Sequence, residues 1–200
     1  MQPRVNRALI LASTSSYRRA LLERLRLPFA VQAPGVDETP LPGEEPSALA
    51  CRLAAAKAQA VAHTAPRAVV IGCDQVADLN GQALGKPGQY ATAVNQLRAM
   101  RGQTVVFQTA MAVVCLESGF SESVLVPVRV AYRDVSDVEI DFYLRAEEPY
   151  DCAGSVKSEG MGIALMQSIE NDDPTALIGL PLIRLSALLQ RAGIPVLGTM

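Results

Sequence analysis

Residues 68–81 read AVVIGCDQVADLNG, an apolar run that carries the acid Asp74 and closes on the pair Asn80-Gly81. The stretch from Ala68 to Ala77 is almost free of polar residues, which predicts a buried β-strand. Its apolar part stops at Asp74, so we expect this acid at the end of the strand. Asn-Gly is the strongest short-range signal for a two-residue hairpin turn, because both residues tolerate the positive φ angles that the turn requires.

Strands and helices alternate outward from this segment in both directions. Apolar and β-branched runs predict further strands over 9–13, 28–33, 104–116, 123–132 and 163–169. Helices are expected over 16–26, from a cap at Ser47 to about 65, over 91–100 and 136–146, and in a closing segment that includes 187–192. A turn at Ser118-Gly119 makes the two long strands antiparallel. The pattern predicts an α/β fold, with a mixed, partly antiparallel sheet flanked by helices in one domain over residues 1–200.

Composition and charge exclude several classes of protein. The chain has 200 residues, of which 50% are hydrophobic, and a net charge of −2, so one domain or two lobes with a shared core can form. A near-neutral chain has no general basic field for duplex nucleic acid, and an anionic ligand must meet a local basic cluster. The longest uncharged run, 102–116, is too short and too polar for a membrane span, and no secretory signal opens the chain. We therefore expect a cytoplasmic protein.

Cysteine and histidine usage narrows the chemistry further. Cys51, Cys73, Cys115 and Cys152 are widely spaced without a CxxC pair, which favours small buried residues in a reducing compartment. His63 is the single histidine, so metal sites with two histidines from one chain are excluded. Carboxylates remain as the candidates for acid, base and metal ligand.

A candidate anion site follows the first strand. Ser13 to Ser16 can cap the next helix, whose first turn carries Arg18 and Arg19. A helix N-terminus offers free N–H groups and the positive end of its dipole, and arginine adds bidentate donors for phosphate oxygens. The alternative is an ordinary capped helix with arginines that face solvent.

Two acidic positions are candidates for metal binding or base catalysis. Asp74 at the end of a buried strand could hold a divalent cation or orient an attacking water, although it could also simply cap the following turn. Asp37-Glu38 lies in a loop rich in Gly and Pro, where acids are usually solvated. Asp37 and Glu38 are candidates for metal binding only if Asp74 faces them.

The ordered motifs of the chain resemble those of one known family. They are LASTSSYRR at 11–19, VDE at 36–38, Lys57 on the second helix, IGCDQV at 71–76, GKP at 85–87, AGSVKSEG at 153–160 and IGLPL at 178–182. In this order they are similar to the motifs of the Maf family of nucleoside triphosphate pyrophosphatases, with Ser16 where proline is usual.

The resemblance implies a fold and a set of roles. The implied fold has two lobes around a cleft, as in Maf and ITPase-like proteins, and the implied reaction cleaves a nucleotide between its α- and β-phosphates. Asp74 would act as general base or hold a divalent cation (Mg²⁺, Mn²⁺ or Co²⁺), with Glu38 as a second metal ligand. The implied phosphate-binding residues are Ser13, Arg18, Arg19, Lys57 and Lys86.

Three positions resemble the branch of the family that acts on 7-methyl-GTP. Tyr17 stands where that branch carries an aromatic residue, Gln75 follows the catalytic acid, and Glu159 lies in the late motif. Methylation at N7 makes the guanine ring cationic, and an aromatic face attracts a cation by about 0.5–2 kcal/mol. A carboxylate at Glu159 can accept hydrogen bonds from guanine N–H groups.

Two alternatives remain open from the sequence. One is a pyrophosphatase of the same family that acts on dTTP, UTP or other modified nucleotides. The other is a non-enzymatic nucleotide-binding protein linked to cell division. The expected partner of the enzyme is a small nucleotide substrate, without duplex nucleic acid or membrane, and the resemblance suggests a homodimer.

Overall fold

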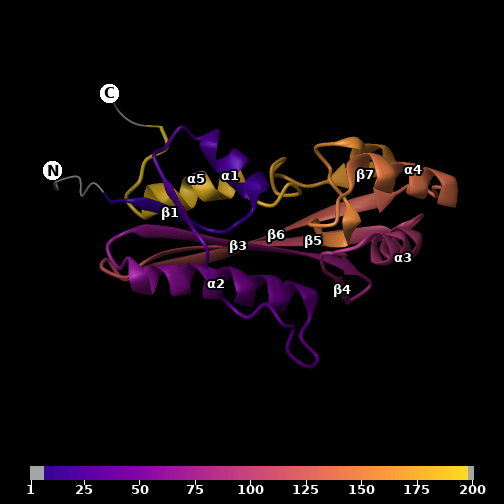
Figure 1. The fold of residues 1–200 in the computed structure, drawn as a ribbon. Coiled ribbons are helices and arrows are strands. Elements are labelled where there is room, and N and C mark those ends of the chain that lie inside the picture. The colour runs from indigo at the N-terminus through magenta and orange to yellow at the C-terminus, as the bar shows by residue number, and fades with distance from the viewer. Residues whose placement is uncertain (1–6, 198–200) are drawn as a thin grey trace.

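The computed structural model describes residues 7–197 and has a seven-stranded sheet at its centre (Figure 1). The strands are β1 (Leu9–Ala12), β2 (Ala30–Gln32), β3 (Val69–Leu79), β4 (Gln82–Leu84), β5 (Thr104–Cys115), β6 (Phe120–Tyr132) and β7 (Met166–Glu170). The helices are α1 (Ser16–Glu23), α2 (Pro46–Thr64), α3 (Tyr90–Met100), α4 (Asp137–Glu147) and α5 (Leu182–Arg191), with short 3₁₀ turns at η1 (Ala153–Ser155) and η2 (Met161–Leu165).

The sheet is mixed, as the sequence predicts. Its order is β2-β1-β3-β5-β6-β7, and β4 pairs with β3 beside this path. β1 runs parallel to β2 and β3, whereas β3, β5, β6 and β7 pair antiparallel. Asn80 and Gly81 have φ angles of 54° and 85° and connect β3 to β4, so the hairpin predicted at this pair is confirmed.

The two faces of the sheet are covered differently. α2 lies along one face, where it packs against Ile10, Val70 and Val114. On the opposite face, α1 and α5 cover one end of the long strands, and α3 and α4 pack at the other end (Figure 1). The two ends have separate apolar clusters, which we call the α1/α5 lobe and the α3/α4 lobe. The long strands β3, β5 and β6 pass through both lobes and join them.

α2 approaches β3 unusually closely because of Gly72. A Cβ atom at this position would lie 2.2 Å from the carbonyl oxygen of Ala54 and 2.5 Å from the backbone nitrogen of Ala58. Both of these α2 residues are themselves small, so the helix backbone rests almost directly on the strand. Any side chain at position 72 would push α2 away and with it Lys57, which lies between the two alanines.

Part of β3 has a sheet neighbour on one side only. Its pairing with β1 ends at Gly72, and its pairing with β4 begins at Ala77. Among the strands described, only β5 pairs with residues 73–76. Asp74 therefore lies in the middle of β3, and the expectation that it ends the strand was wrong. On this open side, Gln75 lines a cavity.

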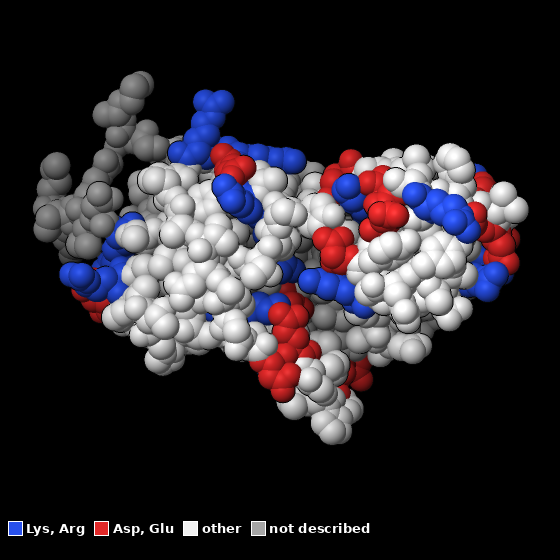
Figure 2. Space-filling view, viewed as in Figure 1, with Lys and Arg blue, Asp and Glu red and all other residues white. Residues whose placement is uncertain are grey.

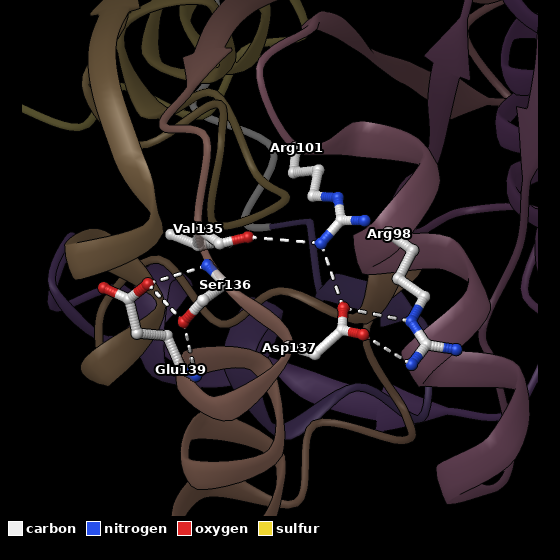
Figure 3. A network of polar contacts seen from close by, with 6 residues as sticks. All are labelled: Arg98, Arg101, Val135, Ser136, Asp137 and Glu139. Atoms are coloured by element: carbon white, nitrogen blue, oxygen red, sulfur yellow. Dashed lines mark hydrogen bonds and ion pairs between the residues drawn. The ribbon is translucent and has the colours of Figure 1, made fainter.

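A polar network links α3 and α4 at the start of α4 (Figure 3). Asp137 accepts hydrogen bonds from Arg98 at 2.8 Å and Arg101 at 2.9 Å, which join α4 to α3. Ser136 and Glu139 form a capping box, in which each side chain bonds the other residue's backbone N–H. These contacts fix the start of α4 against the end of α3.

Several expected element boundaries need correction. α1 ends at Glu23 rather than Arg26, where the φ angle of 53° is not helical. Glu45 occupies the N-cap position of α2 and Pro46 its first turn, so Ser47 is inside the helix and is not its cap. The strand expected over 163–169 begins only at Met166, because residues 161–165 form a 3₁₀ turn.

The described residues can be compared with two expectations from composition, one on membrane spans and one on the cysteines. None of the helices between residues 7 and 197 combines the length and apolar character that crossing a bilayer requires. All four cysteines are free, and Cys73 and Cys115 are buried as predicted, whereas Cys51 and Cys152 are half-buried. His63 is exposed and contacts only the backbone of its own helix, through Gln59.

Candidate active site

Lys57 stands between two carboxylates on the α2 side of β3. Its Nζ donates to Asp74 Oδ1 at 2.6 Å and lies 2.7 Å from Glu38 Oε1. Lys57 and Asp74 are only 5% and 7% exposed, whereas Glu38 reaches in from the loop before α2. The structure thus brings together the carboxylate of Asp74 from β3, the ammonium of Lys57 from α2 and the loop carboxylate of Glu38. From the sequence, the loop acid was of interest only if Asp74 proved to lie near it.

Burial raises the pKa of the Asp74 carboxyl above its ordinary value. Lys57 and Arg18 partly offset this rise by stabilising the charged form, and Glu38 adds to it by repulsion. A carboxyl with a raised pKa is a stronger base once ionised, which suits it to accept a proton from water.

A cavity of about 290 Å³ opens beside Lys57, and we call it the lysine cavity. The N-terminus of α1 forms one wall, where Ser15 caps the helix by accepting from the backbone N–H of Arg18. Ser13 lies behind this turn and accepts from the backbone N–H of Ser15 at 3.1 Å. Glu38, Lys57 and Lys86 complete the polar lining. Helix N–H groups and several cations in one hollow suit an anion.

A second cavity, also of about 290 Å³, lies at the gap between the two lobes, and we call it the tyrosine cavity. Tyr17, Gln75 and Glu159 all line it, although they come from three distant parts of the chain. Asp151 lies beside Tyr17, whose hydroxyl points at Asp151 Oδ1 from 3.5 Å. Apolar side chains complete the wall, among them that of Leu177. An aromatic ring, two acids and apolar surface suit a flat cationic ligand.

The Tyr17 hydroxyl and the Cys152 thiol keep their protons at neutral pH. Burial raises the pKa of the Tyr17 hydroxyl, and the nearby Cys152, Asp151 and Glu159 raise it further. Burial likewise raises the pKa of the Cys152 thiol to about 12. Tyr17 and Cys152 therefore stay protonated and neutral, and the carboxylates supply the negative charge of the cavity.

The two cavities meet at the open side of β3. Thr14, Ser15, Arg18 and Lys86 line both of them. Arg18 is held in place because its Nε donates to the carbonyl oxygen of Gly179 at 3.1 Å. In Figure 2, blue and red side chains gather at the waist between the two ends of the molecule. A ligand with an anionic and an aromatic part could therefore occupy both hollows at once.

Successive residues of β3 face opposite sides of the sheet, where Gln75 lines the tyrosine cavity and Asp74 meets the lysine cavity through its hydrogen bond to Lys57. Side chains alternate across a strand, so Asp74 faces α2 and Lys57, whereas Gln75 faces the loop at Ala176 on the other side. Two adjacent residues thus contribute to the two halves of one site.

Arg19 is a predicted site residue whose side chain the structure places away from both cavities. Its side chain is 63% exposed and pairs with Glu23 one turn along α1 at 3.0 Å. It lines neither cavity, because the helix turns it about 100° away from Arg18. The alternative of a solvent-facing arginine, open from the sequence, describes Arg19 but not Arg18.

The structure adds residues that sequence reasoning missed. Asp151 and Cys152 line the tyrosine cavity, and Thr109 lies buried beneath Gln75. Asp151 and Cys152 immediately precede the motif AGSVKSEG, so proximity to it was the available signal. Thr109 offers no local signal, because it resembles any other polar residue of a strand. Asp173 is fully buried, but its carboxylate caps α5 by accepting from the backbone of Ile183.

Comparison with known proteins shows the family to which the chain belongs. The profile of a family described as "Maf-like protein" matches residues 8–192. A protein of Polaromonas sp. named 7-methyl-GTP pyrophosphatase is 68% identical over 94% of this chain and 86% of its own length. Proteins of the same name from Albidiferax ferrireducens and Aromatoleum aromaticum are 63% and 57% identical, over 99% and 93% of this chain and 100% and 96% of their own lengths. The chain belongs to the Maf family.

Proposed function

We propose that this chain is a cytoplasmic nucleoside triphosphate pyrophosphatase that hydrolyses 7-methyl-GTP to 7-methyl-GMP and diphosphate. The observation that carries the proposal is the pair of cavities that meet across β3. One offers cations and helix N–H groups for a triphosphate, and the other offers an aromatic ring with two carboxylates for a cationic base. The names of the relatives, at 57–68% identity, support the same substrate.

Beside the lysine cavity, Asp74 acts either as the general base that accepts the proton of the attacking water or as an anchor for the cation that activates this water. Water adds to the α-phosphorus, the bond from this phosphorus to the bridging oxygen breaks, and diphosphate leaves. Lys57 sits against Asp74 and keeps a positive charge beside the reacting phosphate. Arg18 and Lys86, at the junction of the cavities, would neutralise the charge that develops on the leaving diphosphate. Ser13 supports the turn that carries the helix N–H groups.

The carboxylates fit a divalent cation only in part. Within residues 7–197, no cluster of three or more His, Cys, Asp or Glu side chains could enclose a metal ion. Asp74 and Glu38 nevertheless converge on one cationic point, the Lys57 ammonium. Mg²⁺ commonly uses one or two carboxylates and takes its other ligands from phosphates and water. We propose that these two acids hold Mg²⁺, Mn²⁺ or Co²⁺ with the substrate, where the ion would supply charge neutralisation.

In the tyrosine cavity, the base is recognised by charge and shape. The ring of Tyr17 provides a face for the N7-methylated purine, and cation–π attraction is worth about 0.5–2 kcal/mol. Glu159 accepts from guanine N–H groups, and its charge attracts the methylated ring. Asp151 holds the Tyr17 hydroxyl and adds a second negative charge near the base.

A nucleotide panel tests the proposal. Diphosphate release is measured for 7-methyl-GTP, GTP, UTP and dTTP, each with Mg²⁺, Mn²⁺ or Co²⁺ and with a chelator. We expect the highest kcat/KM for 7-methyl-GTP and no turnover with the chelator. A preference for UTP or dTTP would contradict the substrate, and full activity with the chelator would contradict the metal. Nucleotide binding without diphosphate release would favour a non-enzymatic binding protein.

The assembly state is a separate proposal, which rests on the resemblance alone. We infer that the protein forms a homodimer. Light scattering coupled to size-exclusion chromatography measures the mass directly, and a mass near that of one 21.3 kDa chain would contradict it.

A further inference from the structure

The side-chain amide of Gln75 is held in one orientation. Its Nε2 lies 2.8 Å from Thr109 Oγ1, 2.9 Å from the carbonyl oxygen of Leu177 and 3.1 Å from that of Ala176, and these three acceptors share its two hydrogens. Backbone carbonyl oxygens can only accept hydrogen bonds, so the NH₂ group must face them. If the amide were rotated by 180°, the Oε1 atom of Gln75 would lie against the carbonyl oxygens of Ala176 and Leu177 with no hydrogen between them.

Thr109 strengthens this orientation through its single hydroxyl hydrogen. That hydroxyl donates to the carbonyl oxygen of Ala176 at 3.0 Å, so it has no hydrogen left and can only accept from Gln75. Thr109 is completely buried and lies directly across from Gln75 in the pairing of β3 with β5. It cannot touch a ligand itself, and any effect on a ligand must pass through Gln75.

The locked amide leaves its carbonyl oxygen available to a ligand. Gln75 lines the tyrosine cavity. Within the part of the chain described, its Oε1 takes part in no hydrogen bond and is not one of the buried polar atoms without a partner. The oxygen is therefore accessible, and it can only accept.

We propose that Thr109 is a positioning residue that makes Gln75 an obligate hydrogen-bond acceptor toward the base. Together with the carboxylate of Glu159, Gln75 then presents acceptors to a base edge that carries N–H donors. The N1–H and 2-amino groups of a 7-methylated guanine form such an edge. Uracil and thymine present one N–H between two carbonyl oxygens. These oxygens would lie against the acceptor oxygens of Gln75 and Glu159 with no hydrogen between them, which is unfavourable. This inference rests on the proposed function and specifies how its substrate is selected.

The experiment compares 7-methyl-GTP with 7-methyl-ITP, which keeps the charged ring but lacks the 2-amino group. The preference is the ratio of the two kcat/KM values, measured for the wild type, Thr109→Val, Gln75→Met and the double variant. We expect a wild-type preference of about tenfold or more, and a loss of about three- to tenfold in each single variant. Because Thr109 acts through Gln75, the double variant should match Gln75→Met within about twofold.

Matched variants separate positioning from general damage. Thr109→Ser keeps the hydroxyl and should keep the preference, and Thr104→Val removes an exposed hydroxyl at the start of the same strand and should change nothing. Thr109→Ala provides a second variant without the hydroxyl if Thr109→Val does not fold. An unchanged preference in folded Thr109→Val or Thr109→Ala would overturn the inference. Losses of preference that add up in the double variant would overturn it as well. Absence of 7-methyl-GTP turnover in the wild type would instead overturn the proposed function.

Discussion

The lysine cavity and the tyrosine cavity have similar volumes, but they differ in what their residues can do. Around Lys57 a buried ammonium and two carboxylates lie within hydrogen-bonding distance, and such a cluster can move protons and bind phosphate. Around Tyr17 the polar groups lie among apolar side chains, a lining that suits the proposed recognition of the base. Under the proposed function, one strand separates reaction from specificity, because alternate residues of β3 point to opposite faces of the sheet.

This separation leads to a clear expectation for variants. Changes on the α2 side of β3 should reduce turnover of every nucleotide by the same factor. Changes on the opposite face should alter the ratio of kcat/KM between nucleotides. The kcat/KM for the poorest substrate should stay largely unaffected.

The largest effect is expected from Asp74→Asn. The substitution keeps the size and a hydrogen-bond partner for Lys57 but removes the group that accepts the proton of water. We expect kcat to fall about 1,000-fold or more for 7-methyl-GTP and GTP alike. Diphosphate release measures the rate, and circular dichroism on heating confirms folding. A folded variant with near-normal turnover would remove Asp74 from the mechanism.

Lys57→Met should have the next largest effect and should also change the pH dependence. We expect a loss of about 100-fold in kcat for all nucleotides, because a positive group near the phosphates is gone. The pKa of Asp74 is already raised by burial, and losing Lys57 removes one interaction that lowers it. Since the carboxylate is the active form, the acid side of the kcat/KM profile should move to higher pH. A profile that stays in place would contradict the coupling of these residues.

The same pKa shift has a consequence for stability. A carboxyl whose pKa is higher in the folded than in the unfolded state favours folding below the unfolded value. That contribution is lost as the pH rises through the folded pKa. In Lys57→Met, the free energy of unfolding should therefore decline with rising pH over a wider range than in the wild type. Urea unfolding at several pH values measures this difference.

Glu159→Gln should change preference more than turnover. It removes a negative charge from the tyrosine cavity while keeping the side-chain size. We expect the preference for 7-methyl-GTP over GTP to fall about tenfold, because only the methylated ring is cationic. Glu170→Gln, on exposed β7 outside both cavities, serves as the control. A fall of equal size for both nucleotides would mean that Glu159 acts on the reaction rather than on the base.

The smallest effect is expected from Arg19→Ala. Its pair with Glu23 is exposed on both sides, and such pairs on a helix contribute about 0.3–0.5 kcal/mol. We expect kcat/KM to stay within about twofold of the wild type. Arg18→Ala, one residue earlier and at the junction of the cavities, should cost far more. Equal losses in the two variants would contradict the placement of Arg19 outside the site.

Local features of the fold were predictable because neighbouring residues decide them. The turn at Asn80-Gly81 and the helix cap at Ser15 follow from backbone preferences and short-range hydrogen bonds. The 3₁₀ turn over 161–165 was not predictable, because its apolar residues also fit a strand. Asp74 lies in the middle of β3 because β3 pairs with β5 as far as Asp78 and with β4 from Ala77 on, and this long-range pairing with β5 is not visible in the residues around Asp74.

The sequence by itself determined the chemistry that this protein can use. One histidine and the absence of paired cysteines left acids, arginines and lysines, and the ordered motifs around Asp74 indicated the family. Only the tertiary structure decided which partners these residues meet. Lys57 reaches Asp74 because Gly72 lets α2 lie against the strand, and Gln75 is oriented by Thr109 and by a loop about a hundred residues away in the chain. Contacts of this kind follow from sheet register and close packing, which no short stretch of sequence specifies.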